Sequence, residues 1–161
     1  MSKISEHLEL AEVIRSEQAK RLGLSNMPTP EHIENFKKLA ENIFEPIRKN
    51  FRVPIHISSG YRSVELNKAI KGSSTSQHCK AEAIDVDMDG SSNGVTNKMV
   101  FDYIYKNLYF DHFIWEYGND TNPDWVHVSY SSSKPQRKQA LKCTRVNGQP
   151  HYEPYHNKAS I

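Results

Sequence analysis

The sequence is poor in cysteine, has no long apolar run and carries no strong excess of charge of either sign. Its two cysteines, Cys79 and Cys143, lie far apart and form no C-x-x-C pair, which favours two free thiols in a reducing compartment. No run of about 18 apolar residues occurs, so we expect no membrane span. The net charge of +2 arises from scattered lysines and arginines, which argues against a nucleic-acid-binding domain.

The N-terminal stretch MSKISEHLELAEVIRSEQAK contains no uninterrupted apolar segment, so we expect no secretory signal peptide and a protein made in the cytoplasm. The length of 161 residues, with 37% hydrophobic and 25% charged residues, is typical of one globular domain, which we expect to be a monomer.

Helical periodicity dominates the first 50 residues. We predict a short helix over 8–22 and a longer one that starts at Thr29 as N-cap, with Pro30 in its first turn. Apolar residues recur at intervals of three and four from Ile33 to Ile47, which indicates one buried helical face. Pro46 should bend or end this helix.

Short strands follow the helical segment. The two strands at 111–117 and 124–130 are joined by the loop GNDTNPD, which predicts an antiparallel hairpin. The pattern indicates an α+β single domain over 1–161, in which helices pack on a small, mostly antiparallel sheet. Its predicted parts are N-terminal helices over 1–50, a core over 51–130, and a C-terminal tail over 131–161 without clear periodicity. Within the core we expect strands at 55–58 and 81–89 and helices at 63–70 and 96–108.

One strand contains an unexpected acidic residue. Aspartate is disfavoured in strands because its side chain competes for backbone hydrogen bonds, yet Asp85 lies inside the run AEAIDVDMD. Alternation places Asp85 on the face opposite Ile84 and Val86, and it places His127 on the non-core face of DWVHVSY. His78 lies in the loop that leads into the first of these strands.

His78, Asp85 and His127 are the residue types of a catalytic zinc site, which has three protein ligands and leaves the fourth position to water. Such a site also needs a carboxylate that takes the proton of the attacking water. Asp124, three residues before His127, and Glu116, at the end of the preceding strand, are both candidates, and the hairpin register decides between them. On spacing alone, His127 could also be a half-buried histidine bonded to a neighbour. We expect His112, His151 and His156 to be surface groups.

The stretches SGYRS, SQHCKAEAIDVD and WVHVSY, in this order and spacing, resemble the M15 family of zinc peptidases, which includes D-alanyl-D-alanine carboxypeptidases and phage endolysins. The resemblance is closest to the small phage-like branch and implies an M15 or hedgehog-like fold with the zinc site at the sheet. The family pattern S-x-H-x-x-G-x-A-x-D falls on Ser76 to Asp85, with Ala81 in place of the usual glycine. If that position requires a positive φ, alanine costs about 1 kcal/mol or more.

By this resemblance, His78, Asp85 and His127 bind one Zn²⁺, and Arg62 stabilises the oxyanion of the tetrahedral intermediate. The resemblance favours Asp124 as the catalytic acid, with Glu116 as the alternative found where family members lack an acid at that position. Ser76 is expected to cap its loop.

The function implied is hydrolysis of peptidoglycan stem or cross-bridge peptides by a phage or prophage endolysin, or by a D,D-carboxypeptidase-like enzyme. Such an enzyme reaches the periplasm or cell wall only when it is released from the cytoplasm. The alternative is a non-catalytic, zinc-stabilised wall-binding or structural module of the same fold.

Overall fold

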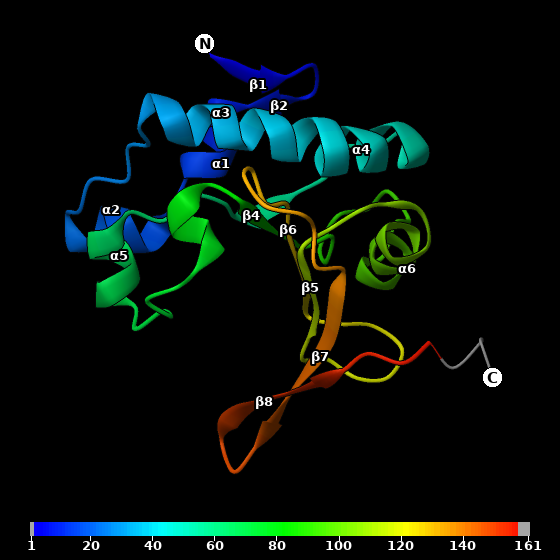
Figure 1. Ribbon diagram of the computed structural model, residues 1–161. Coiled ribbons are helices and arrows are strands. Elements are labelled where there is room, and N and C mark those ends of the chain that lie inside the picture. The colour runs from blue at the N-terminus through cyan, green and yellow to red at the C-terminus, as the bar shows by residue number, and fades with distance from the viewer. Residues whose placement is uncertain (1, 158–161) are drawn as a thin grey trace.

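The computed structural model describes residues 2–157 and has a six-stranded sheet at its centre (Figure 1). The strand order is β3-β4-β6-β5-β7-β8, and every neighbouring pair is antiparallel except β5 and β7, which are parallel. The α+β prediction is therefore confirmed. The strands are β3 (Ile57–Ser59), β4 (Ala83–Val86), β5 (His112–Glu116), β6 (Trp125–Ser129), β7 (Gln139–Val146) and β8 (Gln149–Pro154).

The N-terminal segment forms more elements than the single helix predicted over 8–22. A small hairpin precedes two short helices, and the chain breaks between the helices at Arg15 and Ser16. The hydroxyl of Ser16 accepts a hydrogen bond from the Ala19 amide at 3.1 Å, so Ser16 starts a new helix as its N-cap. These elements are β1 (Lys3–Ser5), β2 (Leu8–Glu9), α1 (Leu10–Ile14) and α2 (Glu17–Leu22).

The long helix begins as predicted and passes Pro46 without ending. Thr29 accepts a hydrogen bond from the His32 amide at 3.2 Å, and α3 (Pro30–Leu39) follows. A π-helical segment over Ala40–Phe44 then leads into α4 (Glu45–Phe51), which has Pro46 in its first turn. Because proline has no N–H and its ring crowds the preceding turn, the wider π-turn at this point accommodates it without breaking the helix.

The hydrophobic core lies between one face of the sheet and the helices α3, α4 and α6 (Asn97–Asn107), as Figure 1 shows. Ile84 and Val86 of β4 face this core, as the alternation in the sequence predicted. The opposite face of the sheet carries the polar side chains. It lies toward α5 (Val64–Ala69) and the short 3₁₀ helix Gln77–Lys80. Within the described residues, no helix is long and apolar enough to cross a membrane.

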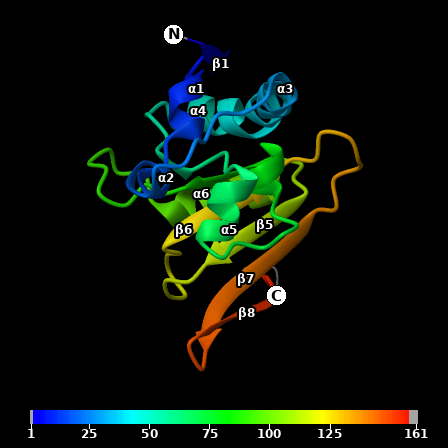
Figure 2. The same ribbon diagram turned by 90° about the vertical axis from the view of Figure 1, so that its left-hand side faces the viewer.

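Two strands occur in the C-terminal segment, where the sequence indicated only a tail without clear periodicity. Strand β7 pairs with β5, and β8 pairs with β7 to form an arm that extends beyond the rest of the sheet (Figures 1 and 2). All six residues of β8 are exposed, and in β7 three of the eight residues are exposed and only one is buried. An arm with little core burial requires no alternation of apolar and polar residues, so sequence periodicity gives no signal for it.

The packing of α6 on the sheet leads to a first prediction. Phe101 is fully buried, and its ring stacks on Phe113 of β5 with centroids 4.1 Å apart. We expect Phe101→Ala to lower the free energy of unfolding by about 3–5 kcal/mol, because it deletes a large buried side chain and leaves a cavity. Urea denaturation measures this change. Met99→Ala on the same helix, at a side chain that is 42% exposed, is the control and should change stability by less than about 1 kcal/mol.

Candidate metal centre

Asp85 and His127 face each other across the pairing of β4 and β6. The register sets Asp85 directly opposite His127, and the distance between Asp85 Oδ1 and His127 Nδ1 is 3.0 Å. Both side chains point away from the core because their neighbours Ile84 and Val128 point into it. Two ligands are therefore brought together by the register of one strand pair.

His78 reaches the same position from the 3₁₀ helix before β4. The hydroxyl of Ser76 accepts a hydrogen bond from the His78 amide at 3.2 Å, which confirms Ser76 as the cap of this loop. Ala81, which follows the 3₁₀ helix, has φ of 59°. The site where the family pattern has glycine thus requires the left-handed conformation, which costs an alanine about 1–2 kcal/mol.

The ring of His78 is oriented by its backbone neighbour. Its Nδ1 lies 2.6 Å from the carbonyl oxygen of Gly60, so Nδ1 carries the proton and donates it. Nε2 then presents a lone pair, is buried, and has no hydrogen-bond partner among the described residues. It lies 3.3 Å from Asp85 Oδ1, which is also an acceptor. Two acceptors that face each other in a buried site repel, and a cation bound between them would satisfy both.

The electrostatics of Asp85 agree with this arrangement. Burial raises its pKa, but the imidazoles of His78 and His127 lower it more, and the net result lies well below its usual range. The carboxyl is therefore ionised, and one ligand atom from each of these three residues lies within 4.8 Å of the others. A set of two imidazole nitrogens and one carboxylate oxygen fits zinc.

A second cluster with similar spacing is explained without a metal. Glu6, His7 and Glu45 also lie within 4.8 Å of one another. Glu45 accepts hydrogen bonds from the Ser5 hydroxyl at 2.6 Å and from the His7 amide at 3.0 Å, and His7 Nδ1 lies 2.6 Å from its other oxygen. This carboxylate is satisfied by the β1–β2 hairpin, which it holds against α4.

The three candidate ligands line a cavity of about 590 Å³. Its other lining residues include Arg62, His112, Glu116, Trp125, Arg137, Arg145 and Tyr152. Glu116 is 8% exposed, and burial raises its pKa to about 7. A carboxyl with this pKa exchanges protons near neutral pH, as a general base must.

Asp124 lies outside this cavity. It is exposed, its amide donates to the Glu116 carbonyl at 2.9 Å, and its own carbonyl accepts from Asn97 Nδ2 at 3.0 Å. Its separation of three residues from His127 is an odd number, which is the wrong parity for a residue on the same face of a regular strand. In the hairpin register, Glu116 instead pairs with Trp125, two residues from His127 and on the same face.

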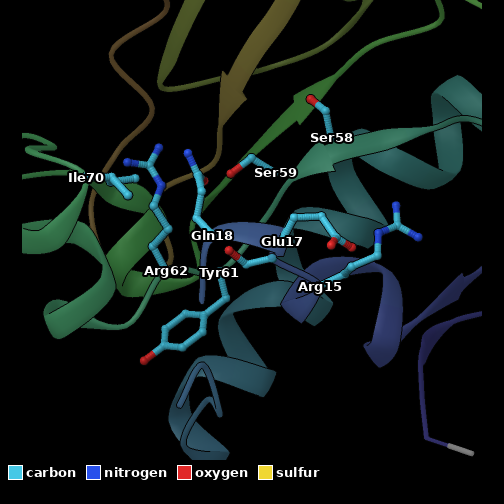
Figure 3. A pocket seen from close by; sticks show the side chains of 9 residues that line it. Arg15, Glu17, Gln18, Ser58, Ser59, Tyr61, Arg62 and Ile70 are labelled. Atoms are coloured by element: carbon cyan, nitrogen blue, oxygen red, sulfur yellow. The ribbon is translucent and has the colours of Figure 1, made fainter. Parts of the chain in front are cut away.

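Arg62 lines this cavity and also a second, polar cavity of about 310 Å³, whose lining side chains are shown in Figure 3. Its Nη1 donates to Asn67 Oδ1 at 3.1 Å, and its amide donates to the His78 carbonyl at 3.1 Å. Its Nε is buried and has no partner among the described residues. The backbone of Arg62 is thus bonded to that of the ligand His78, and its guanidinium is held by Asn67 with a donor to spare. Arg15, Glu17, Ser58 and Tyr61 line the second cavity with it.

His112 also lines this cavity. The prediction of a surface group was wrong, because His112 is half-buried, lines the cavity, and has its ring 6.1 Å from that of His127. Burial, with a smaller contribution from His127, lowers its pKa to about 4, so it is neutral at pH 7. The available signal was its alternation with Ile114 and Glu116, which places all three on one face.

Residues 6–129 match the family model described as Peptidase M15. This range includes the three candidate ligands, Arg62 and Glu116, and it ends just before the segment that forms β7 and β8. No curated protein matches the chain.

The geometry predicts how metal binding responds to loss of a ligand. We expect His127→Ala to weaken zinc binding by more than about 100-fold, because even the loss of a residue that only orients a ligand costs about 10–100-fold. Far-ultraviolet circular dichroism should stay unchanged. His112→Ala removes a histidine from the same cavity without removing a ligand and should retain one zinc per chain. Metal analysis after dialysis distinguishes these outcomes, and zinc loss in both variants would contradict the assignment of ligands.

The raised pKa of Glu116 predicts a pH dependence of stability in the metal-free protein. Between about 4.5, its ordinary value, and about 7, the folded chain binds more protons than the unfolded chain. The contribution of Glu116 to the free energy of unfolding therefore decreases as pH rises through this window, by on the order of 2–3 kcal/mol. Urea denaturation in the presence of a chelator, at pH 5 and pH 7, measures this contribution as the difference in the free energy of unfolding between the parent protein and Glu116→Gln. His112 titrates in both proteins, so its effect cancels in the difference. If the difference in the free energy of unfolding between the two proteins is the same at both pH values, the raised pKa of Glu116 is contradicted.

Proposed function

The chain belongs to the M15 peptidase family and is a metal-dependent peptidase, and we propose that its metal is zinc and that its substrates are peptidoglycan stem or cross-bridge peptides. The observation that carries the proposal is the buried Nε2 of His78, which has no hydrogen-bond partner among the described residues. It faces the Asp85 carboxylate beside His127, in a cavity that Glu116 also lines. In this proposal the protein is an endolysin of a phage or prophage, or a D,D-carboxypeptidase-like enzyme, that acts on the cell wall after its release.

His78 Nε2, Asp85 Oδ1 and His127 would hold the zinc ion. When bound, zinc supplies Lewis-acid chemistry, since it polarises a carbonyl oxygen and lowers the pKa of water toward neutrality. The chain orients these ligands beforehand. The Gly60 carbonyl fixes the tautomer of His78, and the strand register fixes Asp85 against His127.

Glu116 is the proposed general base. Its carboxylate would take the proton from the attacking water and later transfer it to the amine of the leaving peptide. Two observations support this role over Asp124: Glu116 lines the cavity whereas Asp124 does not, and burial brings the pKa of Glu116 to about 7.

Arg62 is the proposed stabiliser of the oxyanion. A guanidinium keeps its charge at every relevant pH and offers several N–H donors in a fixed plane. Asn67 holds Nη1, and the remaining donors of Arg62 are directed by this contact. In a cavity from which substrate displaces water, such a donor stabilises developing negative charge more than it would in water.

The function itself is tested by digestion of purified peptidoglycan. We expect new amine termini and shortened muropeptides with the zinc-loaded protein and neither product in the presence of a chelator, with mass spectrometry to identify the bond. A non-catalytic wall-binding module would sediment with peptidoglycan and release nothing under either condition.

The assignment of the base predicts unequal effects of two conservative substitutions. We expect Glu116→Gln to lower kcat by about 10²–10⁴-fold with zinc retained, which is the usual contribution of a positioned general base. Asp124→Asn should stay within about threefold of the parent protein, because its side chain lies outside the cavity. Steady-state rates and zinc content are measured together. Large loss of activity in Asp124→Asn, with zinc retained, would transfer the role to Asp124.

A further inference from the structure

One wall of the cavity comes from a segment that the family match does not include. The match ends at residue 129, whereas Arg137, Arg145 and Tyr152 line the same cavity as the three candidate ligands. Two of these three belong to the β7–β8 arm, which extends from the sheet in Figures 1 and 2. This chain therefore completes its cavity with residues outside the part that the family model describes.

The sheet register brings the arm close to Glu116. Glu116 of β5 pairs with Cys143 of β7, and Cys143 pairs with Tyr152 of β8, so the three lie in one row on the cavity face. Arg145 is two residues beyond Cys143 and therefore points to the same face. At about 3.3 Å per residue and about 4.8 Å between strands, the Cα atoms of Arg145 and Glu116 lie roughly 8 Å apart.

The guanidinium of Arg145 lies over an aromatic ring. Its Cζ is 4.2 Å from the centroid of Tyr117, whose ring in turn lies 5.5 Å from that of Trp125. In the part of the chain that the structure describes, Arg145 makes no ion pair and no side-chain hydrogen bond. Stacking on a ring fixes the plane of a guanidinium while its N–H donors stay available at the edge.

Arg137 shows the contrast within the same cavity. Its Nε and Nη2 donate to the two oxygens of Asp111 at 3.0 and 2.9 Å, and Asp111 is buried. The charge of Arg137 is thus paired with a carboxylate of the protein itself. Arg62 is also without an acidic partner among the described residues, but it lies beside His78 and has a proposed role in the reaction itself. Among the cavity residues that the structure describes, Arg145 is therefore a cation with neither an acidic partner nor a proposed role in the reaction.

We propose that Arg145 binds a carboxylate of the peptide substrate, about two or three residues from the scissile bond, and so selects anionic peptides. This inference rests on the proposed peptidase function of the same cavity. An extended peptide advances about 3.3–3.6 Å per residue, so two or three residues cover the distance from Glu116 to Arg145. A guanidinium pairs with a carboxylate through two parallel hydrogen bonds, and Tyr117 orients the plane for this geometry. The peptides of peptidoglycan carry free carboxylates of this kind on their acidic residues.

The test compares two synthetic stem peptides that differ only in whether the internal carboxylates are free or amidated. For the zinc-loaded parent protein, kcat/KM should be higher for the free carboxylate by about 10–100-fold, as expected for a hydrogen-bonded charge pair. Arg145→Gln should lower kcat/KM for this peptide by the same factor, mainly through KM, and leave the amidated peptide within about twofold. Arg145→Lys retains charge without the planar fork and should be intermediate.

Lys142→Gln is the matched control. It removes one positive charge from the same strand, but Lys142 points to the opposite face, where it pairs with Asp120 and lies over Trp115. For Lys142→Gln, the ratio of kcat/KM between the two peptides should equal that of the parent protein. If Arg145→Gln also keeps the full preference for the free carboxylate, the proposal is wrong.

A binding measurement separates this proposal from the proposed function. Calorimetric titration of both peptides into Glu116→Gln, with and without Arg145→Gln, reports recognition where the reaction is suppressed. If the parent protein cleaves neither peptide and releases nothing from peptidoglycan, the proposed function fails. The binding data still test recognition by Arg145 in that case. A preference for the free carboxylate that disappears with Arg145→Gln supports recognition by Arg145, and equal affinities for the two peptides in both proteins overturn it.

Discussion

The antiparallel register of β4 and β6 is the constraint on which the site depends. It places Asp85 opposite His127 on one face while Ile84 and Val128 meet on the other. A slip of one residue would exchange the faces, because side chains alternate strictly along a strand. The buried apolar face prevents this slip, since it would expose core residues and bury charged ones. The hydrophobic core therefore maintains the geometry of the metal ligands.

The N-terminal segment supports the site through a chain of backbone contacts. The carbonyl of Gly60 accepts from His78, and the next amide, that of Tyr61, donates to the Val13 carbonyl at 2.6 Å. A side chain at residue 60 would meet the Val13 carbonyl oxygen at 2.4 Å, so only glycine permits α1 to approach this closely. The helices before residue 50 are consequently part of the support of the ligand His78 and not a separate unit beside the sheet.

The two acidic residues of the cavity, Asp85 and Glu116, have different environments and therefore different pKa values. Asp85, next to two imidazoles, stays ionised, whereas burial raises the pKa of Glu116 to about 7 against the opposing effect of His127. Two carboxyl groups with pKa values pushed apart are a common basis for separating a charged ligand from a proton acceptor. The strained backbone at Ala81 is accepted in this setting, because its left-handed turn directs the chain from the ligand His78 into β4.

The amino-acid sequence by itself determined the α+β class, the long helix from Thr29, the hairpin of β5 and β6, and the location of Asp85 and His127 on non-core faces, because period and caps are local properties. Tertiary structure decided what depends on register and on distant contacts. In the folded chain, Glu116 lines the cavity and Asp124 lies outside it. His112 also lines the cavity, and β7 and β8 form from a segment without periodicity. Strand register and edge pairing depend on which partner each strand finds, and no local pattern in a single segment encodes that choice.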